Sequence, residues 1–203
     1  MSDAAAWDAR YAGGGFAFGE APNRYLAAQA ALLPPRGRAL AIGDGEGRNG
    51  VWLAERGLAV TGLDWSATGL AKAAALARQR GVALETVTAD LTAWSWPEST
   101  FAVIAWIFVH LPPADRALVA THAAAALAPG GLLVLEGFTP AQGGRRSGGP
   151  RDPDLLWSAA LVREHFPDLE ILECLEGTVL LDEGPKHQGH AEVARAVLRR
   201  GGK

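Results

Sequence analysis

The most informative stretch of this sequence reads Arg38-Ala-Leu-Ala-Ile-Gly-Asp-Gly-Glu-Gly-Arg-Asn-Gly50. Its apolar start predicts a short buried strand, and residues 51–54 are expected to continue as a helix. Between them, Gly43, Gly45 and Gly47 let the backbone bend sharply and let a ligand approach where a Cβ would block it. A strand, a glycine-rich turn and the start of a helix together predict a nucleotide-type binding site at the carboxyl edge of a sheet.

Two interpretations of the glycine pattern compete. From Gly43 the pattern is GxGxG, and from Gly45 it is GxGxxG ending at Gly50, which fits a dinucleotide fingerprint. The next expected strand, 58–63, leads to Asp64, whose carboxylate can accept hydrogen bonds from both ribose hydroxyls of an adenosine ligand in either interpretation. The motif therefore predicts an adenosine cofactor without saying which one.

The order of motifs along the chain adds a family resemblance. The glycine turn is followed by Asp64, by Asp90 and by Leu127-Ala-Pro-Gly-Gly131, and this succession resembles class I S-adenosylmethionine-dependent methyltransferases. Three further stretches are similar to the small bacterial branch that includes the tellurite-resistance and thiopurine-type methyltransferases: Gly47-Arg-Asn49, Phe18-Gly-Glu-Ala-Pro-Asn23 and Asp182-Glu-Gly-Pro-Lys-His-Gln-Gly189. The resemblance covers nearly the whole chain.

The resemblance implies S-adenosyl-L-methionine as the cofactor and assigns roles around it. The glycines of the turn, together with Asn49, would lie along the methionine part, Asp64 would bind the ribose, and Asp90 with Leu91 would bind the adenine. Trp65 would pack against the nucleoside, and the backbone around Trp106 would complete the cofactor wall. An alternative role for Asp90 is that of a turn or helix-cap residue.

The sequence departs from the family pattern at Ala41. The resembled motif carries an acidic residue two positions before the first glycine, near the amino group of the cofactor, and that position is Ala41 here. Asp44, in the turn itself, could supply the missing charge from a shifted position. If neither residue acts, a catalytically silent S-adenosylmethionine-binding sensor becomes the alternative.

The remaining pattern predicts an α/β fold: a doubly wound, mostly parallel seven-stranded sheet with an antiparallel C-terminal hairpin. Strands that alternate with helices imply right-handed parallel crossovers, whereas the short connection between the last two strands requires them to be antiparallel. The expected strands are 39–42, 58–63, 84–88, 101–106, 132–136, 169–181 and 191–199, and the main helices are 66–80, 115–127 and 154–165.

Two segments outside this pattern are candidates for covering the site. Residues 1–35 are a lead-in with four aromatic residues in twelve and an expected helix at about 23–33, and they are expected to act as a lid on a single domain of residues 1–203. Residues 138–153 form a loop rich in Gly, Pro and Arg that is interpreted as a linker, or as a flap that closes over an anionic substrate through Arg145, Arg146 or Arg151.

Composition limits the remaining possibilities. A net charge of -3 gives no basic surface of the kind that nucleic acid requires, and the longest apolar run, 101–109, is too short to span a membrane. The start of the chain does not read as a signal peptide, and the single Cys174 fits a reducing compartment, so a cytoplasmic location is expected. A small-molecule substrate and a monomer or homodimer are the corresponding expectations.

The candidates for chemistry are two histidines. His110 follows the fourth expected strand at the ligand-binding edge and could act as a general base, and His187 lies in a polar group before the last strand. A metal site at His187 and His190 is not expected, because further ligands are lacking. A thiol or a tellurium or selenium species would need little base assistance as a methyl acceptor, and sequence alone does not choose between acceptors.

A nicotinamide-dependent oxidoreductase is the competing enzyme. A short-chain dehydrogenase needs a Tyr/Lys pair, but Tyr11 and Tyr25, the two tyrosines of the chain, precede the glycine motif and lack a suitably spaced lysine. Methyl transfer asks for less, because the sulfonium is already activated and the protein mainly holds the reactants in line and excludes water.

Overall fold

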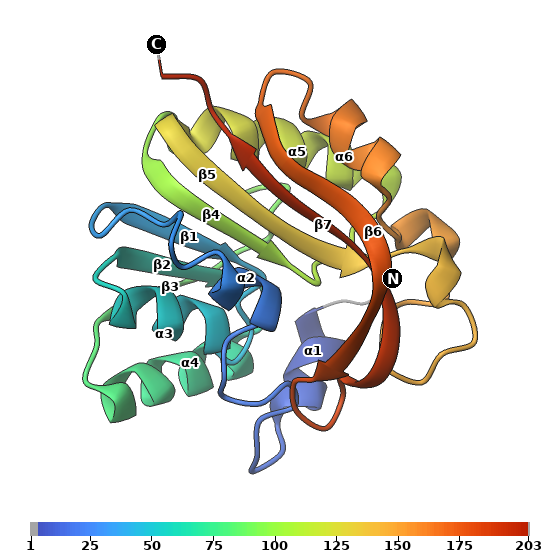
Figure 1. Ribbon diagram of the computed structural model, residues 1–203. Helices are drawn as coiled ribbons and strands as arrows, with labels where there is room; N and C mark the ends of the chain where they lie inside the picture. Colours follow the sequence, from blue (N-terminus) through green and yellow to red (C-terminus); the bar gives the residue numbers. More distant parts are fainter. Residues whose placement is uncertain (1–3, 203) are drawn as a thin grey trace.

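The computed structural model describes residues 4–202 and contains one seven-stranded sheet with the order β3-β2-β1-β4-β5-β7-β6 (Figure 1). The expectations for residues 1–3 and 203, including the very start of the lid, lie outside the described residues. The strands are β1 Arg38–Ile42, β2 Ala59–Asp64, β3 Leu84–Thr88, β4 Phe101–Ile107, β5 Leu127–Phe138, β6 Glu170–Asp182 and β7 Gln188–Arg199. The helices are α1 Ala4–Tyr11, α2 Arg24–Ala28, α3 Arg48–Glu55, α4 Ala67–Arg80, α5 Pro113–Ala126 and α6 Ala159–His165.

Strands β1 to β5 are parallel, and β7 runs antiparallel to both β5 and β6. The predicted doubly wound α/β sheet with an antiparallel C-terminal hairpin is therefore confirmed. The register aligns the carboxyl ends of three strands, because Ile42 of β1 pairs with Leu63 of β2 on one side and with Trp106 of β4 on the other. The loops that follow these three strands consequently meet at one place.

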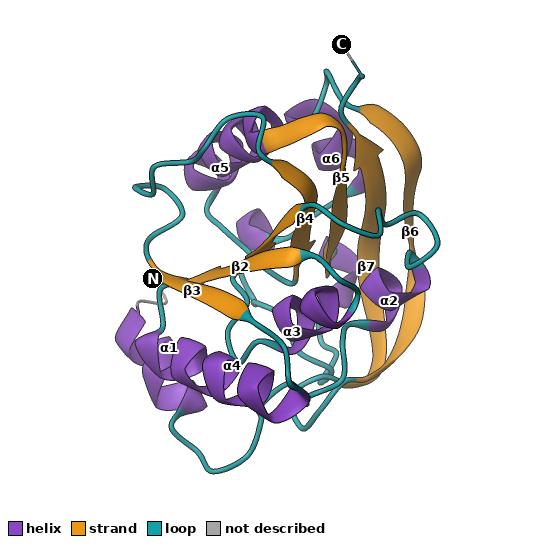
Figure 2. Cartoon of the chain, turned by 90° about the vertical axis from the view of Figure 1, so that its left-hand side faces the viewer, coloured by secondary structure: helices purple, strands orange, loops and turns teal. Residues whose placement is uncertain are grey.

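Helices cover both faces of the sheet, as Figure 2 shows. Alternate residues of β4 explain this: Ile104 and Trp106 pack toward α5 and α6, whereas Val103, Ala105 and Ile107 pack toward α2 and α3. A parallel strand that is buried on both faces must be apolar throughout, which is the pattern that the sequence shows there.

Local signals define most helix ends. Ser66 caps α4 by accepting a hydrogen bond from the Gly69 amide at 3.0 Å, and Gly81 ends this helix in the left-handed conformation, both as the sequence predicts. The helix expected at about 23–33 is shorter in the structure, where α2 begins at Arg24 and ends at Ala28. The helix expected from 154 begins instead at Ala159, because Ser158 is the residue that caps it.

No helix among residues 4–202 combines the length and the apolar character that crossing a membrane would require.

Candidate functional site

The glycine bend, residues 43–47, joins β1 to α3 at the carboxyl edge of the sheet. Gly43, Gly45 and Gly47 all have positive φ angles, of 57°, 54° and 89°, which residues with a Cβ rarely adopt. A Cβ on Gly47 would also lie 2.5 Å from the Cβ of Ala73 on α4. The bend therefore requires glycine twice over, for its backbone conformation and for the close approach of a neighbouring helix.

The ligand-facing space at the bend is covered by two side chains in this conformation. A Cβ on Gly45 would lie 2.5 Å from the Tyr11 hydroxyl oxygen of α1, and a Cβ on Gly43 would meet the Val109 side chain. The backbone of the bend is therefore covered by Tyr11 and Val109.

Asp64 lies beside the bend, where its sequence position predicts. Its Oδ2 accepts a hydrogen bond from the Gly45 amide at 2.9 Å, and its Oδ1 accepts one from the Ser66 amide at 2.8 Å. Burial raises the pKa of this carboxyl, although the backbone hydrogen bonds oppose that shift. Each oxygen keeps capacity to accept a further hydrogen bond, which is what two ribose hydroxyls need.

Asp44 lies between α3 and β2 instead of standing free in the crevice. Its Oδ1 accepts a hydrogen bond from the Gly50 amide at 2.9 Å, and its Oδ2 is buried without a partner in the described part of the chain. A Cβ on Gly62 of β2 would come within 2.8 Å of this oxygen, so the glycines make room for the carboxyl. Burial raises the pKa of Asp44 to about 7. This placement gives no support to Asp44 as a substitute for the acidic residue missing at Ala41.

The residues expected along the nucleoside differ in their exposure and in their hydrogen bonds. Asp90 is exposed, and its Oδ1 accepts hydrogen bonds from the amide and the hydroxyl of Thr92 at 2.8 and 2.7 Å, which is the turn role left open by the sequence. Leu91 is buried, and its carbonyl accepts a hydrogen bond from the Trp96 indole at 2.9 Å. Trp65 is half-buried next to Asp64.

The Trp106 side chain belongs to the core instead of the crevice. Its ring packs edge-on against Trp157, with centroids 5.4 Å apart, and no part of it is exposed. The indoles of Trp106 and Trp157 both donate to the Val109 carbonyl, at 3.0 and 3.2 Å. Trp106 thus fixes the backbone of the residue that lies on Gly43.

Asn49 takes part in a buried polar tie between segments that are distant in sequence. Its Oδ1 accepts a hydrogen bond from the Asn23 amide at 2.9 Å, and the Asn23 side chain donates to Glu136 of β5 and to Glu183 before β7. Arg48 forms an ion pair with Glu183 at 2.7 Å, with both side chains less than 10% exposed. The tie joins the lead-in, the start of α3, β5 and the β6–β7 turn. Glu183 belongs to the polar group expected before the last strand, and its part in this tie has no signal in the local sequence.

The lead-in segment is fastened to the glycine bend. Lys72 of α4 donates to the carbonyls of Gly13 and Gly15 at 2.6 and 2.7 Å and to Glu46 of the bend at 2.9 Å. The second oxygen of Glu46 accepts a hydrogen bond from the Ala17 amide at 2.7 Å. A residue of the bend and a residue of α4 therefore hold the lead-in over the site.

The two candidate catalytic histidines share one aromatic cluster, composed of Phe18, Phe108, Phe138, His110 and His187. The His187 ring lies 4.6 Å from Phe18 and from Phe108 and 5.5 Å from Phe138, and the His110 ring stacks on Phe138 at 5.6 Å. Burial lowers the pKa of His110 to about 4 and that of His187 to about 3. Phe108 has a positive φ of 54°, and this strained residue directly follows β4.

The sequence signals for the cluster were incomplete. The sequence placed His110 after the fourth strand, Phe18 in the expected lid and Phe138 in the expected loop 138–153, but no local pattern indicated that these residues would meet. No group of three or more His, Cys, Asp or Glu side chains that could hold a metal ion occurs among residues 4–202.

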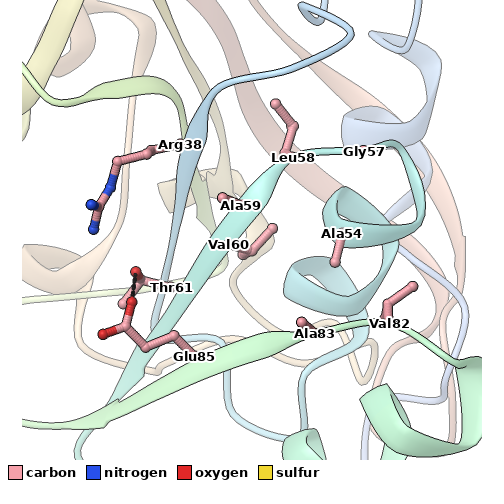
Figure 3. A pocket seen from close by; sticks show the side chains of 10 residues that line it. All are labelled: Arg38, Ala54, Gly57, Leu58, Ala59, Val60, Thr61, Val82, Ala83 and Glu85. Carbon is pink, nitrogen blue, oxygen red and sulfur yellow. Dashed lines mark hydrogen bonds between the residues drawn. The ribbon is translucent and has the colours of Figure 1, made fainter.

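A shallow depression of about 530 Å³ lies at the opposite, amino edge of the sheet (Figure 3). Its charged lining residues are Arg38 and Glu85, which come from the first residues of β1 and β3, and Thr61 donates a hydrogen bond to Glu85 at 2.9 Å. The depression has no unpartnered buried polar atom and lies away from the carboxyl ends where α/β sheets bind ligands.

A family model matches the central part of the chain. Residues 39–131 match the family model described as a methyltransferase domain, and this range begins at β1 and includes the glycine bend, Asp64 and β4. No curated protein sequence matches the chain.

Several solved structures share the fold. TehB from Haemophilus influenzae has a TM-score of 0.73 at 17% identity, covering 96% of this chain and 66% of its own. The protein described under "Conversion of a Disulfide Bond into a Thioacetal Group during Echinomycin Biosynthesis" has a TM-score of 0.77 at 22% identity, covering 96% of this chain and 90% of its own. The N-methyltransferase NodS from Bradyrhizobium japonicum, in complex with S-adenosylhomocysteine, has a TM-score of 0.64 at 19% identity, with 81% and 78% covered.

The matched model, which covers just under half of the chain, is described as a methyltransferase domain, and the solved structures share the fold. The expected branch, the tellurite-resistance and thiopurine-type enzymes, is a finer assignment than the match provides.

Proposed function

We propose that this chain transfers the methyl group of S-adenosylmethionine to a small-molecule acceptor at the carboxyl edge of its sheet. The observation that carries the proposal is the glycine bend with Asp64 bonded to it: Gly45 has a positive φ, and its amide donates to Asp64 Oδ2 at 2.9 Å. Such a bend brings backbone amides and a ribose-binding carboxylate to one ligand. The complex of NodS with S-adenosylhomocysteine supports the choice of cofactor.

The residues proposed to hold the cofactor are those of the bend and the strand ends. In this proposal Gly43, Gly45 and Gly47 lie along the methionine part, with Asn49 behind them, and Asp64 binds the ribose. Trp65, Asp90, Leu91 and the backbone after Trp106 line the nucleoside. When bound, S-adenosylmethionine supplies an activated methyl group on a sulfonium, so the protein needs no metal or nucleophile of its own.

The proposed lid is the lead-in, residues 1–35. Tyr11 lies directly on the bend, and Lys72 and Glu46 fasten the chain on either side of Gly15. Closing this segment over bound ligands excludes water, which would otherwise compete for the hydrogen bonds that orient the acceptor.

His110 is the proposed general base, with His187 as its neighbour. The neutral state that burial imposes on both rings leaves each with one nitrogen able to accept a proton. His110 would accept the proton released by an oxygen or nitrogen acceptor. A thiolate or a reduced tellurium or selenium species would need this assistance least.

A cytoplasmic location and a monomeric or homodimeric state complete the proposal. The location is supported by Cys174, which is free and has no partner for an internal disulfide.

A catalytically silent sensor of S-adenosylmethionine is the second candidate. Ala41 favours it, because it leaves the cofactor amino group without the acidic residue of the family pattern, and Asp44 points elsewhere.

Calorimetric titration of the protein with S-adenosylhomocysteine and with NADH separates these functions. The proposal expects binding of S-adenosylhomocysteine alone, followed by its production when S-adenosylmethionine and thiols, phenols, tellurite or selenite are supplied. Tight binding without turnover of any acceptor would favour the sensor, and binding of NADH instead would favour an oxidoreductase.

A further inference from the structure

Two ring nitrogens in the aromatic cluster have no hydrogen-bond partner in the described part of the chain. These are His110 Nε2 and His187 Nδ1, and both atoms are buried from water. Buried polar atoms in folded proteins nearly always have a partner, so each unpartnered nitrogen needs an explanation. Both histidines lie at the ligand-binding edge of the sheet, which makes a bound ligand the natural partner.

The hydrogen-bonding role of His110 can be deduced from its other nitrogen. Nδ1 lies 3.1 Å from the carbonyl oxygen of Leu155, which can only accept, so Nδ1 carries the hydrogen. Burial lowers the pKa of His110 to about 4, and the ring is therefore neutral near pH 7. Its Nε2 is then an acceptor and is suited to a ligand group that donates, such as a hydroxyl or a thiol.

The cations that act on the cluster are held by protein acceptors or exposed to water. At His110 this cation is Arg116, which is buried and donates to the carbonyls of Asp154 and Leu156 at 2.9 and 3.2 Å. Arg48 lowers the pKa of His187, but its guanidinium is paired with Glu183 at 2.7 Å. Arg10 also acts on His187, and it is exposed at the surface of the lead-in. An anion entering the cluster would lose its hydration and would have to draw Arg48 or Arg116 away from these partners, which is costly.

The cluster is closed by segments that are neither helix nor strand. Phe18 belongs to the lead-in that Lys72 and Glu46 hold in place. On the other side, a Cβ on Gly148 would lie 2.9 Å from the His187 ring, and one on Gly149 would lie 2.8 Å from the Phe138 ring. Movement of either segment would expose ring faces of phenylalanine and histidine, against which a flat aromatic molecule packs well.

We propose that the methyl acceptor is an uncharged aromatic compound whose hydroxyl or thiol group donates a hydrogen bond to His110 Nε2 while its ring packs among Phe18, Phe108 and Phe138. This inference rests on the proposed methyltransferase function and narrows it. It favours phenols and aromatic thiols over the oxyanions tellurite and selenite, because the buried cations that act on the cluster, Arg48 and Arg116, already donate to protein acceptors.

The test measures binding to the full-length protein saturated with S-adenosylhomocysteine, by calorimetry or ligand-observed NMR. Three probes differ in one property each: 4-methylphenol, 4-hydroxybenzoate, which adds a negative charge, and toluene, which lacks the donor. We expect 4-methylphenol to bind at least about tenfold more tightly than 4-hydroxybenzoate. His110→Phe should weaken 4-methylphenol about fivefold and leave toluene unchanged, because the ring stacking remains and one hydrogen bond is lost.

A matched control is His122→Phe, since His122 stacks on Trp96 with centroids 6.0 Å apart and lies outside the cluster. This variant should bind all three probes like the wild type.

Three results would overturn the inference. The first is binding of the carboxylate probe or selenite as tight as that of 4-methylphenol. If Arg146→Gln or Arg151→Gln then removed this binding, the acceptor site would lie at the arginine-rich loop. None of the aromatic probes could bind, although S-adenosylhomocysteine does. His110→Phe could weaken toluene as much as 4-methylphenol, which would indicate a purely structural histidine. Failure of S-adenosylhomocysteine itself to bind is a different outcome, because it would refute the proposed function on which the inference depends.

Discussion

The two edges of the parallel sheet differ: the amino edge carries the open depression, and the carboxyl edge carries the proposed cofactor site. The amino edge carries a depression of about 530 Å³ whose charged residues, Arg38 and Glu85, are near solvent. The carboxyl edge is filled by side chains, but it carries the glycine bend with positive φ angles, the buried carboxyl of Asp64 and two unpartnered histidine nitrogens. We therefore propose the carboxyl edge as the site because of its strained backbone and its unsatisfied buried polar groups, and not because of open volume.

The largest expected effect concerns the buried polar tie. Glu183→Ala leaves Arg48 as a buried charge without its partner, and it removes an acceptor of Asn23. We expect the free energy of unfolding to fall by about 3 to 5 kcal/mol, measured by urea denaturation. Asp182→Ala is the matched control, because its ion pair with Arg24 is more than half exposed on both sides and should contribute less than about 1 kcal/mol. Equal losses in the two variants would contradict a buried tie.

The second effect compares the two edges directly. Asp64→Ala should weaken S-adenosylhomocysteine binding about 100-fold, since it removes the proposed ribose acceptor and the carboxylate that holds the Gly45 amide. Calorimetry measures the affinity. Glu85→Ala, which removes the acceptor of the Thr61 hydroxyl at the amino edge, should leave the affinity unchanged. The reverse result would move the cofactor site to the depression.

The third effect is a pH dependence that arises from Asp44. Its folded-state pKa of about 7 exceeds its usual value of 3.8, so the folded protein binds more protons than the unfolded chain between these values. The contribution of Asp44 to stability is therefore favourable below about pH 4 and is lost as the pH rises through about 7. We expect the free energy of unfolding to fall between pH 5 and pH 8, and this fall should be smaller in Asp44→Asn by on the order of 2 kcal/mol. Chemical denaturation at the two pH values measures it. An unchanged pH profile would show that the carboxyl is not buried in this way.

The smallest effect concerns the lead-in. Lys72→Met removes two hydrogen bonds to lead-in carbonyls and the ion pair with Glu46, and it should speed proteolytic cleavage near residues 13–15 about fivefold. Arg80→Met is the control, because Arg80 contacts Glu20 of the same segment only through an exposed pair at 3.6 Å. Identical cleavage rates in both variants would mean that Lys72 does not hold the segment.

The sequence predicted the sheet because its signals are local. The apolar run of β4, the capping Ser66 and the glycine spacing of the bend each reflect the conformation of a few neighbouring residues, and a parallel order of strands follows from them. The expected start of α6 at 154 is wrong, because residues 153–155 form a separate short 3-10 helix and Ser158 caps α6.

The position of a candidate site residue could be predicted from the sequence only where that residue lies at the end of a strand beside the glycine motif. Asp64 lies beside the bend, as its place at the end of β2 predicts, whereas the orientation of Asp44 depends on the space left by Gly62 on another strand. The polar tie joins Asn23 to Glu183 across 160 positions, and such contacts leave no local pattern. Side-chain direction and long-range pairing are therefore the parts that required a structure.

The central claim is that the glycine bend and Asp64 bind the nucleoside of S-adenosylmethionine. A crystal structure of the protein grown with S-adenosylhomocysteine tests it most directly. We expect the ligand at the bend, with its ribose hydroxyls on Asp64 and with the Tyr11 side chain displaced from Gly45. Ligand density in the amino-edge depression, or a bend still covered by Tyr11 and Val109 at saturating ligand, would contradict the claim.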